Sequence, residues 1–265
     1  MIQPSALRPI IDADSIVYRC GFASDNSKDQ WGNPVEEPLE NCLHSVKMQV
    51  KSILSKFDST YRIFLQGGGN YRDRIATIQP YKGNRDPSAR PKYFDEIRSY
   101  LVDFWGAEVI TGMETDDACG IEQWKHKDRS TCIVSLDKDL DNIPGWHYNY
   151  VKDEFYYVTL AQANYNFWKQ VLTGDSTDYV RGIPKVGPKT ADKILAGKES
   201  WVDQYVAVQQ AYASKGIEHE FWENATLVWI QREEGINFDG RPIESATESN
   251  EEGNEEGNEE ASEEG

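Results

Sequence analysis

Apolar and polar positions along the first 160 residues predict strands and helices in turn. Short apolar runs at 9–11, 61–65, 107–110, 131–135 and 147–151 are typical of buried strands, and the periodic segments 39–57 and 93–105 are typical of amphipathic helices. A polar turn at 152–154 followed by FYYVT predicts a hairpin at the sheet edge. This order predicts an α/β domain with a largely parallel sheet.

From about residue 160 the pattern becomes helical. The segments LAQANYNFWKQVL, PKTADKIL, WVDQYVAVQQAYA and FWENATLVWIQR are each typical of a helix. We therefore expect a first domain over 1–160, a helical domain over 161–240 and a tail over 241–265. The tail contains ten Glu residues and no aromatic residue, which predicts a disordered acidic segment. It serves either as a solubilising appendage or as an arm that competes with nucleic acid for basic surfaces.

The net charge of −17 is a weak guide to partners, because more than half of it belongs to this tail. A nucleic-acid partner would need only a local basic patch. Cys20, Cys42, Cys119 and Cys132 form no CxxC pair, so we expect reduced, buried thiols rather than a disulfide framework or a zinc site. No apolar run approaches the roughly 18 residues of a membrane span, and we expect a cytoplasmic protein without membrane contact.

Acidic residues follow several of the predicted strands. In an open parallel sheet the carboxyl ends of the strands share one edge, so these side chains should converge there. Each group also has a simpler explanation, as helix-capping, turn or solvated loop residues. Together they predict a site that needs cations, and an all-oxygen ligand set favours Mg²⁺ or Mn²⁺ over zinc. The candidate ligands are Asp12, Glu114, Asp116, Asp117, Asp137 and Asp139.

The stretch TGDSTDYVRGIPKVGPKTADKIL, residues 173–195, adds two further elements. Asp175 and Asp178 share one face of a helical turn and either contribute ligands or begin the next element as caps. The glycine-rich turn before the predicted helix 188–195 offers backbone amides and lysines to an anion without reading bases. Its candidate DNA-binding residues are Gly182, Lys185, Gly187, Lys189 and Thr190.

A second basic segment covers residues 70–94. It interleaves Arg72, Lys82 and Arg85 with Tyr71 and Tyr81, a composition suited to holding phosphates and stacking on unpaired bases, although a mobile surface loop would look similar.

In the number and order of these motifs, over about residues 8–238, the chain resembles the flap endonuclease and 5′ to 3′ exonuclease family, most closely the small exonucleases of tailed bacteriophages. The resemblance implies a PIN-like catalytic domain with a basic arch at 70–94, followed by a helix-three-turn-helix domain. It implies two metal sites, with Asp12 supporting both, the METDDA acids in the first, and VSLDKDL with GDxxD in the second. Lys82 of PYKGNR, with Arg85, would approach the scissile phosphate, and K⁺ would bind at the 182–190 turn.

One position departs from that pattern. Many relatives place another aspartate after the second strand, where this chain has Gln66 and Gly67. The first metal site would then lack a ligand, or Asp14 or Asn70 would supply one.

The expected activity is two-metal hydrolysis of DNA from free or frayed 5′ ends or flaps by a monomer, with RNA–DNA hybrids as further substrates. Two alternatives stay open, a PIN-type ribonuclease and a structure-specific DNA-binding protein with weakened catalysis.

Overall fold

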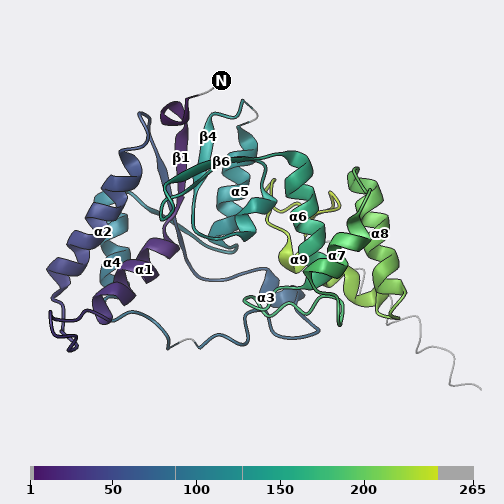
Figure 1. Cartoon of the computed structure of the whole chain (residues 1–265), viewed down its shortest axis with the longest axis horizontal. Coiled ribbons are helices and arrows are strands. Elements are labelled where there is room, and N and C mark those ends of the chain that lie inside the picture. Colours follow the sequence, from purple (N-terminus) through teal and green to yellow (C-terminus); the bar gives the residue numbers. More distant parts are fainter. Residues whose placement is uncertain (1–2, 87, 127, 244–265) are drawn as a thin grey trace, which may run out of the picture.

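A six-stranded sheet forms the centre of the first part of the chain (Figure 1). The computed structural model describes residues 3–86, 88–126 and 128–243. All neighbouring strands pair in parallel except the last two, in the order β3-β2-β1-β4-β5-β6. The predicted parallel sheet and its edge hairpin are thus confirmed. The strands are β1 (Arg8–Asp12), β2 (Arg62–Gln66), β3 (Glu108–Ile110), β4 (Thr131–Val134), β5 (Gly145–Asn149) and β6 (Glu154–Val158).

The chain order reverses at β1. From this strand β2 and β3 extend the sheet in one direction, whereas β4 and β5 extend it in the other. The carboxyl ends of β1 and β4 therefore flank the topological switch point, where open α/β sheets form ligand sites.

Helices cover both faces of the sheet (Figure 1). Side chains alternate along a strand, so Ile11 faces the cluster under α1, α2 and α4, while Ile10 faces a smaller cluster under α5. The bounds are α1 (Asp14–Asp25), α2 (Leu39–Leu54), α4 (Phe94–Trp105) and α5 (Thr115–Lys125).

A further core joins the last helices to part of the basic segment. Trp168 lies at its centre and is fully buried, and Tyr71, Ile75 and Tyr81 pack into the same cluster. Thr159 and Gln162 cap the first of these helices reciprocally. The elements are α3 (Arg72–Ile75), α6 (Leu160–Thr173), α7 (Pro188–Leu195), α8 (Trp201–Ala213) and α9 (Phe221–Val228), with short 3₁₀ turns η1 (Pro4–Ala6), η2 (Asp139–Asn142) and η3 (Glu218–Glu220).

The prediction of a helix over 221–232 is wrong at its end. The helix stops at Val228 and Trp229 is extended, because the Trp229 carbonyl accepts from Arg72 at 2.5 Å and the amide of Gln231 donates to Asp117 at 2.9 Å. All four cysteines are free and buried, as expected. Among the described residues no helix is long and apolar enough to cross a membrane. Most of the expected acidic tail, 244–265, lies outside the described residues, and the domain boundaries remain predictions.

Candidate active site

Asp12 ends β1 at the switch point and is 5% exposed. Its carboxylate accepts from the Ser135 hydroxyl at 2.8 Å and from the Asp14 amide at 3.2 Å. Burial, followed by repulsion from Asp14 and Asp137, raises its pKa to about 7. A carboxylate in this position gains from a nearby cation.

The start of α5 brings the next acids to the same edge. Burial, with repulsion from Asp12 and Asp137, raises the pKa of the half-buried Asp116 well above its usual value. Glu114 behaves differently. Burial alone would raise its pKa, but Arg72 and Lys82 hold it below the ordinary value.

A second acidic group forms where β4 and α6 end. Asp139 begins η2, and burial with repulsion from Asp137 and Asp175 raises its pKa to about 8. Asp175 is the partner with the lowered pKa, because hydrogen bonds to its carboxylate outweigh its burial. Burial also raises the pKa of Asp178.

Five carboxylates line one small cavity of about 20 Å³ between these elements, together with Gln170. They are Glu114, Asp116, Asp139, Asp175 and Asp178. Repulsion from Asp12 and Asp137 contributes to the raised pKa of Asp116, so these strand-end acids lie near the same group. The convergence expected from strand order is therefore present.

Residues 79–85 lie over these acids. Lys82 pairs with Glu114, and its Nζ is 3.6 Å from Asp178. Arg85 binds Asp178 at 2.6 Å, and the Tyr81 hydroxyl contacts Glu114 at 2.9 Å and Asp178 at 2.7 Å. Tyr81 was noted in the sequence only as a stacking residue, and no sequence signal showed that it bridges two acids.

The donor set fits divalent cations in its chemistry, since buried oxygen ligands repel one another without positive charge nearby. In the described part of the chain, however, no group of three or more acidic, His or Cys side chains is arranged to hold a metal ion. Lys82 and Arg85 instead neutralise Glu114 and Asp178.

Arg72 and Asp117 do not have the roles predicted for them. Arg72 is 2% exposed and binds both carboxylate oxygens of Asp117, at 2.6 and 2.9 Å, and the Asp117 side chain is fully buried. Asp117 also accepts from the amides of Glu114 and Gln231. The oxygens of Asp117 are thus occupied, and Arg72 is too buried to contact DNA. Both residues are structural.

The missing aspartate also has a local explanation. A Cβ on Gly67 would lie 2.4 Å from the Ile110 carbonyl oxygen, so no side chain fits there without moving β3. Gln66 accepts from the Thr115 amide at 2.9 Å and helps to fix the start of α5. Neither proposed substitute is free, because Asp14 binds Gln66, Thr115 and Arg98, while Asn70 accepts from the Arg72 amide.

The turn before α7 partly matches its prediction. Lys185, Gly187, Lys189 and Thr190 are exposed, whereas Gly182 is buried with φ +61°. A Cβ at Gly182 would lie 2.2 Å from the Gly174 nitrogen, so glycine lets this turn pack against the end of α6. The amide of Thr190 donates to the Gly187 carbonyl and is not available to an anion, contrary to expectation.

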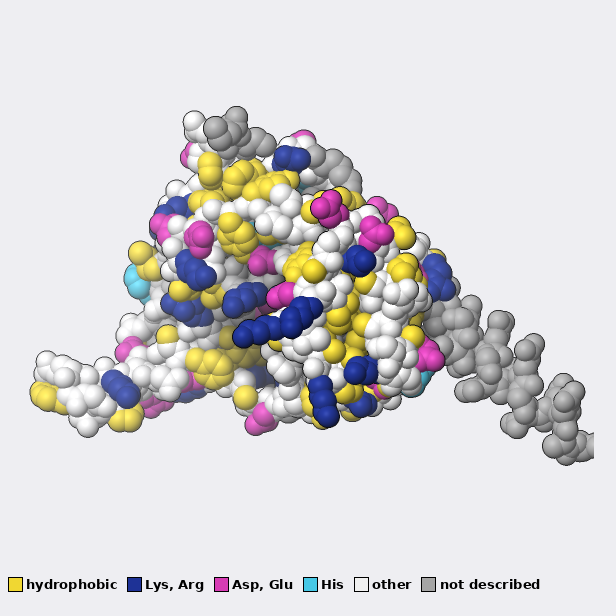
Figure 2. Space-filling model, turned by 45° about the vertical axis from the view of Figure 1, so that its right-hand side comes forward, with side chains coloured by type: hydrophobic (Ala, Val, Ile, Leu, Met, Phe, Trp, Pro, Cys, Tyr) yellow, Lys and Arg dark blue, Asp and Glu magenta, His cyan; other side chains and the backbone are white. Residues whose placement is uncertain are grey.

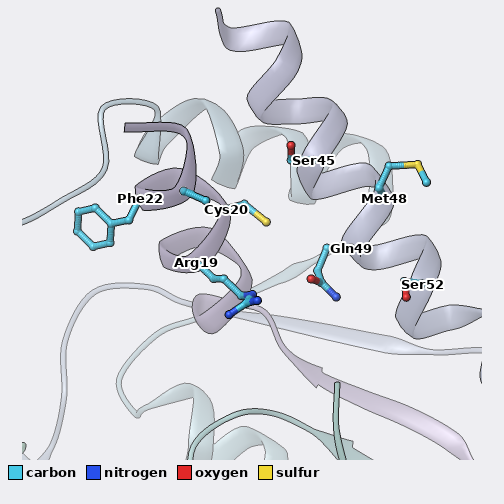
Figure 3. A pocket seen from close by; sticks show the side chains of 8 residues that line it. Arg19, Cys20, Phe22, Ser45, Met48, Gln49 and Ser52 are labelled. Atoms are coloured by element: carbon cyan, nitrogen blue, oxygen red, sulfur yellow. The ribbon is translucent and has the colours of Figure 1, made fainter. Parts of the chain in front are cut away.

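Basic and acidic side chains also lie side by side on the surface. Figure 2 shows Lys and Arg near the middle of one face, next to Asp and Glu. A larger groove of about 790 Å³ lies elsewhere, between α1 and α2, and no acidic residue lines it (Figure 3). The acidic side chains gather at the small cavity and not at this groove.

Curated proteins with related sequences include a 5′-3′ exonuclease, a flap endonuclease and several DNA polymerases I, whereas no family model matches the chain. The 5′-3′ exonuclease of Buchnera aphidicola is 28% identical over 203 residues, which cover 69% of this chain and 67% of that protein. Flap endonuclease Xni of Shewanella piezotolerans is 27% identical, with 76% and 80% covered. DNA polymerase I of Deinococcus radiodurans is 25% identical, and the match spans only 20% of its length.

Solved structures share the fold. The bacteriophage T5 5′-exonuclease with bound zinc superposes with a TM-score of 0.59 at 20% identity, covering 83% of this chain and 88% of that one. The T5 flap endonuclease in a pseudo-enzyme-product complex with DNA and metal ions gives 0.57 at 19%, with the same coverage. By sequence and fold together, the chain is similar to 5′-3′ exonucleases and flap endonucleases.

Proposed function

We propose that the chain is a divalent-metal-dependent 5′ to 3′ exodeoxyribonuclease and structure-specific flap endonuclease that acts in DNA replication, repair or degradation. The observation that carries this proposal is the cavity lined by five carboxylates, with Lys82 and Arg85 placed at its acids. The names of the related proteins support the same reaction.

Two ions, Mg²⁺ or Mn²⁺, would occupy the carboxylate cluster. The first set of ligands would be Glu114 and Asp116, and the second Asp137, Asp139, Asp175 and Asp178, with Asp12 supporting both sites. When bound, such ions supply Lewis acidity to the attacking water and the departing 3′ oxygen. Asp117 is left out of the set because Arg72 occupies its oxygens.

The chain's own residues orient the substrate. Lys82 and Arg85 would exchange their carboxylate partners for the scissile phosphate and neutralise the charge that develops on it. The hydrogen bond from Ser135 holds the Asp12 carboxylate in one orientation at the switch point. Product strands would carry a 5′ phosphate.

The 182–190 turn would hold the duplex away from the cluster. Exposed Lys185 and Lys189 would contact backbone phosphates without reading sequence, and K⁺ would bind at the turn. The substrate is duplex DNA with a free or frayed 5′ end or a flap, with RNA–DNA hybrids also accepted. We further propose a monomer that works in the cytoplasm.

The test uses end-labelled duplex, flap and hybrid substrates with Mg²⁺. Asp137→Asn should remove cleavage while DNA binding in Ca²⁺ stays intact. Asp103→Asn, an exposed acid on α4, is the matched control and should cleave normally. Undiminished cleavage by Asp137→Asn would refute the assignment.

A further inference from the structure

The side-chain amide of Gln170 lies between two parts of the acidic site. Its Oε1 accepts from the Asn142 Nδ2 at 2.7 Å, and its Nε2 donates to the Asp175 Oδ2 at 2.9 Å. This orientation follows from its partners, because turning the amide over would set its oxygen against a carboxylate. Both ends of Gln170 are therefore fixed.

Asn142, which binds the Oε1 of Gln170, is itself held in place. It closes η2, the short turn that begins at Asp139, and it is 4% exposed. Its carbonyl accepts from Arg232 at 3.0 Å. A constraint on Asn142 is thus also a constraint on the turn that presents Asp139.

Asp175 organises the other end. Its Oδ1 accepts from the amides of Thr177 and Asp178, at 2.6 and 3.1 Å, and this folds the turn that presents Asp178. Its other oxygen, Oδ2, accepts from the Gln170 amide. Gln170 therefore connects the turn after β4 to the turn after α6, and it lines the acidic cavity itself.

We propose that Gln170 is a positioning residue that sets the spacing between Asp139 and Asp175 for the second divalent cation. This inference rests on the proposed function. Without the Gln170 amide, the Asp175 carboxylate loses the donor that fixes its Oδ2, and the cation would have to order two mutually repelling groups. Groups that orient metal ligands typically contribute 10–100-fold to metal affinity.

Gln170→Met tests this, because Met is similar in length but has no amide. Asn166→Leu is the matched control. Asn166 lies one turn earlier on α6 and also donates to η2, at the Asp141 carbonyl, 3.0 Å away. The Asn166→Leu variant thus loses a hydrogen bond between α6 and η2, while every donor to Asp175 is kept.

Mn²⁺ binding is measured by isothermal titration calorimetry without DNA, and melting temperatures are measured in a chelator. Gln170→Met should bind the more weakly held of the two Mn²⁺ ions about 10–100-fold less tightly than the wild type. Asn166→Leu should bind that ion with wild-type affinity. Both variants should melt within a few degrees of each other. In cleavage assays, Gln170→Met should show a lower kcat at limiting Mn²⁺, an unchanged KM for DNA, and recovery at high Mn²⁺.

Wild-type Mn²⁺ affinity in Gln170→Met would overturn the inference, as would a kcat that excess Mn²⁺ does not restore. Gln170→Asn, whose shorter side chain keeps an amide without spanning Asn142 and Asp175, should show the same loss and serves if the Met variant is unstable. A wild-type chain that binds no Mn²⁺ and cuts no DNA would instead refute the proposed function.

Discussion

Replacing Arg72 with Met should destabilise the whole fold rather than weaken DNA binding. The guanidinium is 2% exposed and makes four hydrogen bonds: two to Asp117, one to the Leu227 carbonyl at 2.9 Å and one to the Trp229 carbonyl at 2.5 Å. Met can fill much of the volume but satisfies none of these acceptors. The variant would leave a fully buried carboxylate without its counter-ion.

The cost can be estimated from this geometry. Breaking a buried ion pair by removing one partner costs about 3–5 kcal/mol, because the other charge stays buried. For a chain of this size, roughly 2–4 °C of melting temperature is lost per kcal/mol, so the midpoint should fall by about 6–20 °C. A loss of this size is a large fraction of the roughly 5–15 kcal/mol by which natural domains are stable.

Urea and thermal unfolding measure this loss, and Arg74→Met is the matched control. Arg74 is exposed in the same short helix, so its replacement should change stability by less than about 0.5 kcal/mol. In the double variant Arg72→Met with Asp117→Leu, part of the lost stability should return, because the Asp117 carboxylate is then no longer buried without its counter-ion. Equal stability of the two single Met variants, with weaker DNA binding by Arg72→Met alone, would refute the structural role and restore the DNA contact.

Three other predictions concern the same regions. In a chelator, the melting temperature should fall as the pH rises from about 4 to about 8. The pKa values of Asp12 (about 7) and Asp139 (about 8) are raised in the folded chain, which therefore holds protons that the unfolded chain releases over this range. Asp139→Asn should make this fall in melting temperature smaller. Gly182→Ala should cost at least about 1 kcal/mol in urea unfolding, whereas Gly187→Ala, where a Cβ meets open space, should be tolerated. Replacing Lys185 and Lys189 with Ala should reduce the salt slope of duplex binding by about 0.9 per lost phosphate contact, and an unchanged slope would count against the turn as a DNA contact.

Periodicity predicted the strands and several helices, because their packing follows from local pattern, but it predicted no helix at α1 (Asp14–Asp25) and extended α2 three residues too far. The helices over 188–195 and 201–213 begin and end where expected, and the strands differ from prediction by at most two residues at either end. The helix beginning at Phe221 ended early for a reason that lies elsewhere in the chain, since Arg72 and Asp117 hold the backbone at Trp229 and Gln231. Local helix propensity cannot predict a contact with residues so far away in the sequence.

The convergence of acids was also predictable, because strand order in a parallel sheet places Asp12, Asp116 and Asp137 at one edge. What each acid does there was not. Asp116 and Asp117 are neighbours in one helical turn, yet one faces the carboxylate group and the other is enclosed by Arg72. Gln170 gave no signal in the sequence, because its two hydrogen-bond partners lie 28 and 5 residues away.

The basic residues at 70–94 suit phosphate binding but also pair with acids of the site, and the sequence alone could not reveal the second property. Two of these residues form such pairs, Lys82 with Glu114 and Arg85 with Asp178. Uncharged hydrogen bonds to backbone carbonyls support this arrangement, since the Lys82 amide donates to Asp178 at 2.9 Å and the Asn84 side chain donates to Ser176 at 2.9 Å. These hydrogen bonds do not depend on charge, so they can hold the segment in place while Lys82 and Arg85 change partners. If Glu114 and Asp178 held divalent cations, Lys82 and Arg85 would lose these carboxylate partners and could bind the phosphate instead.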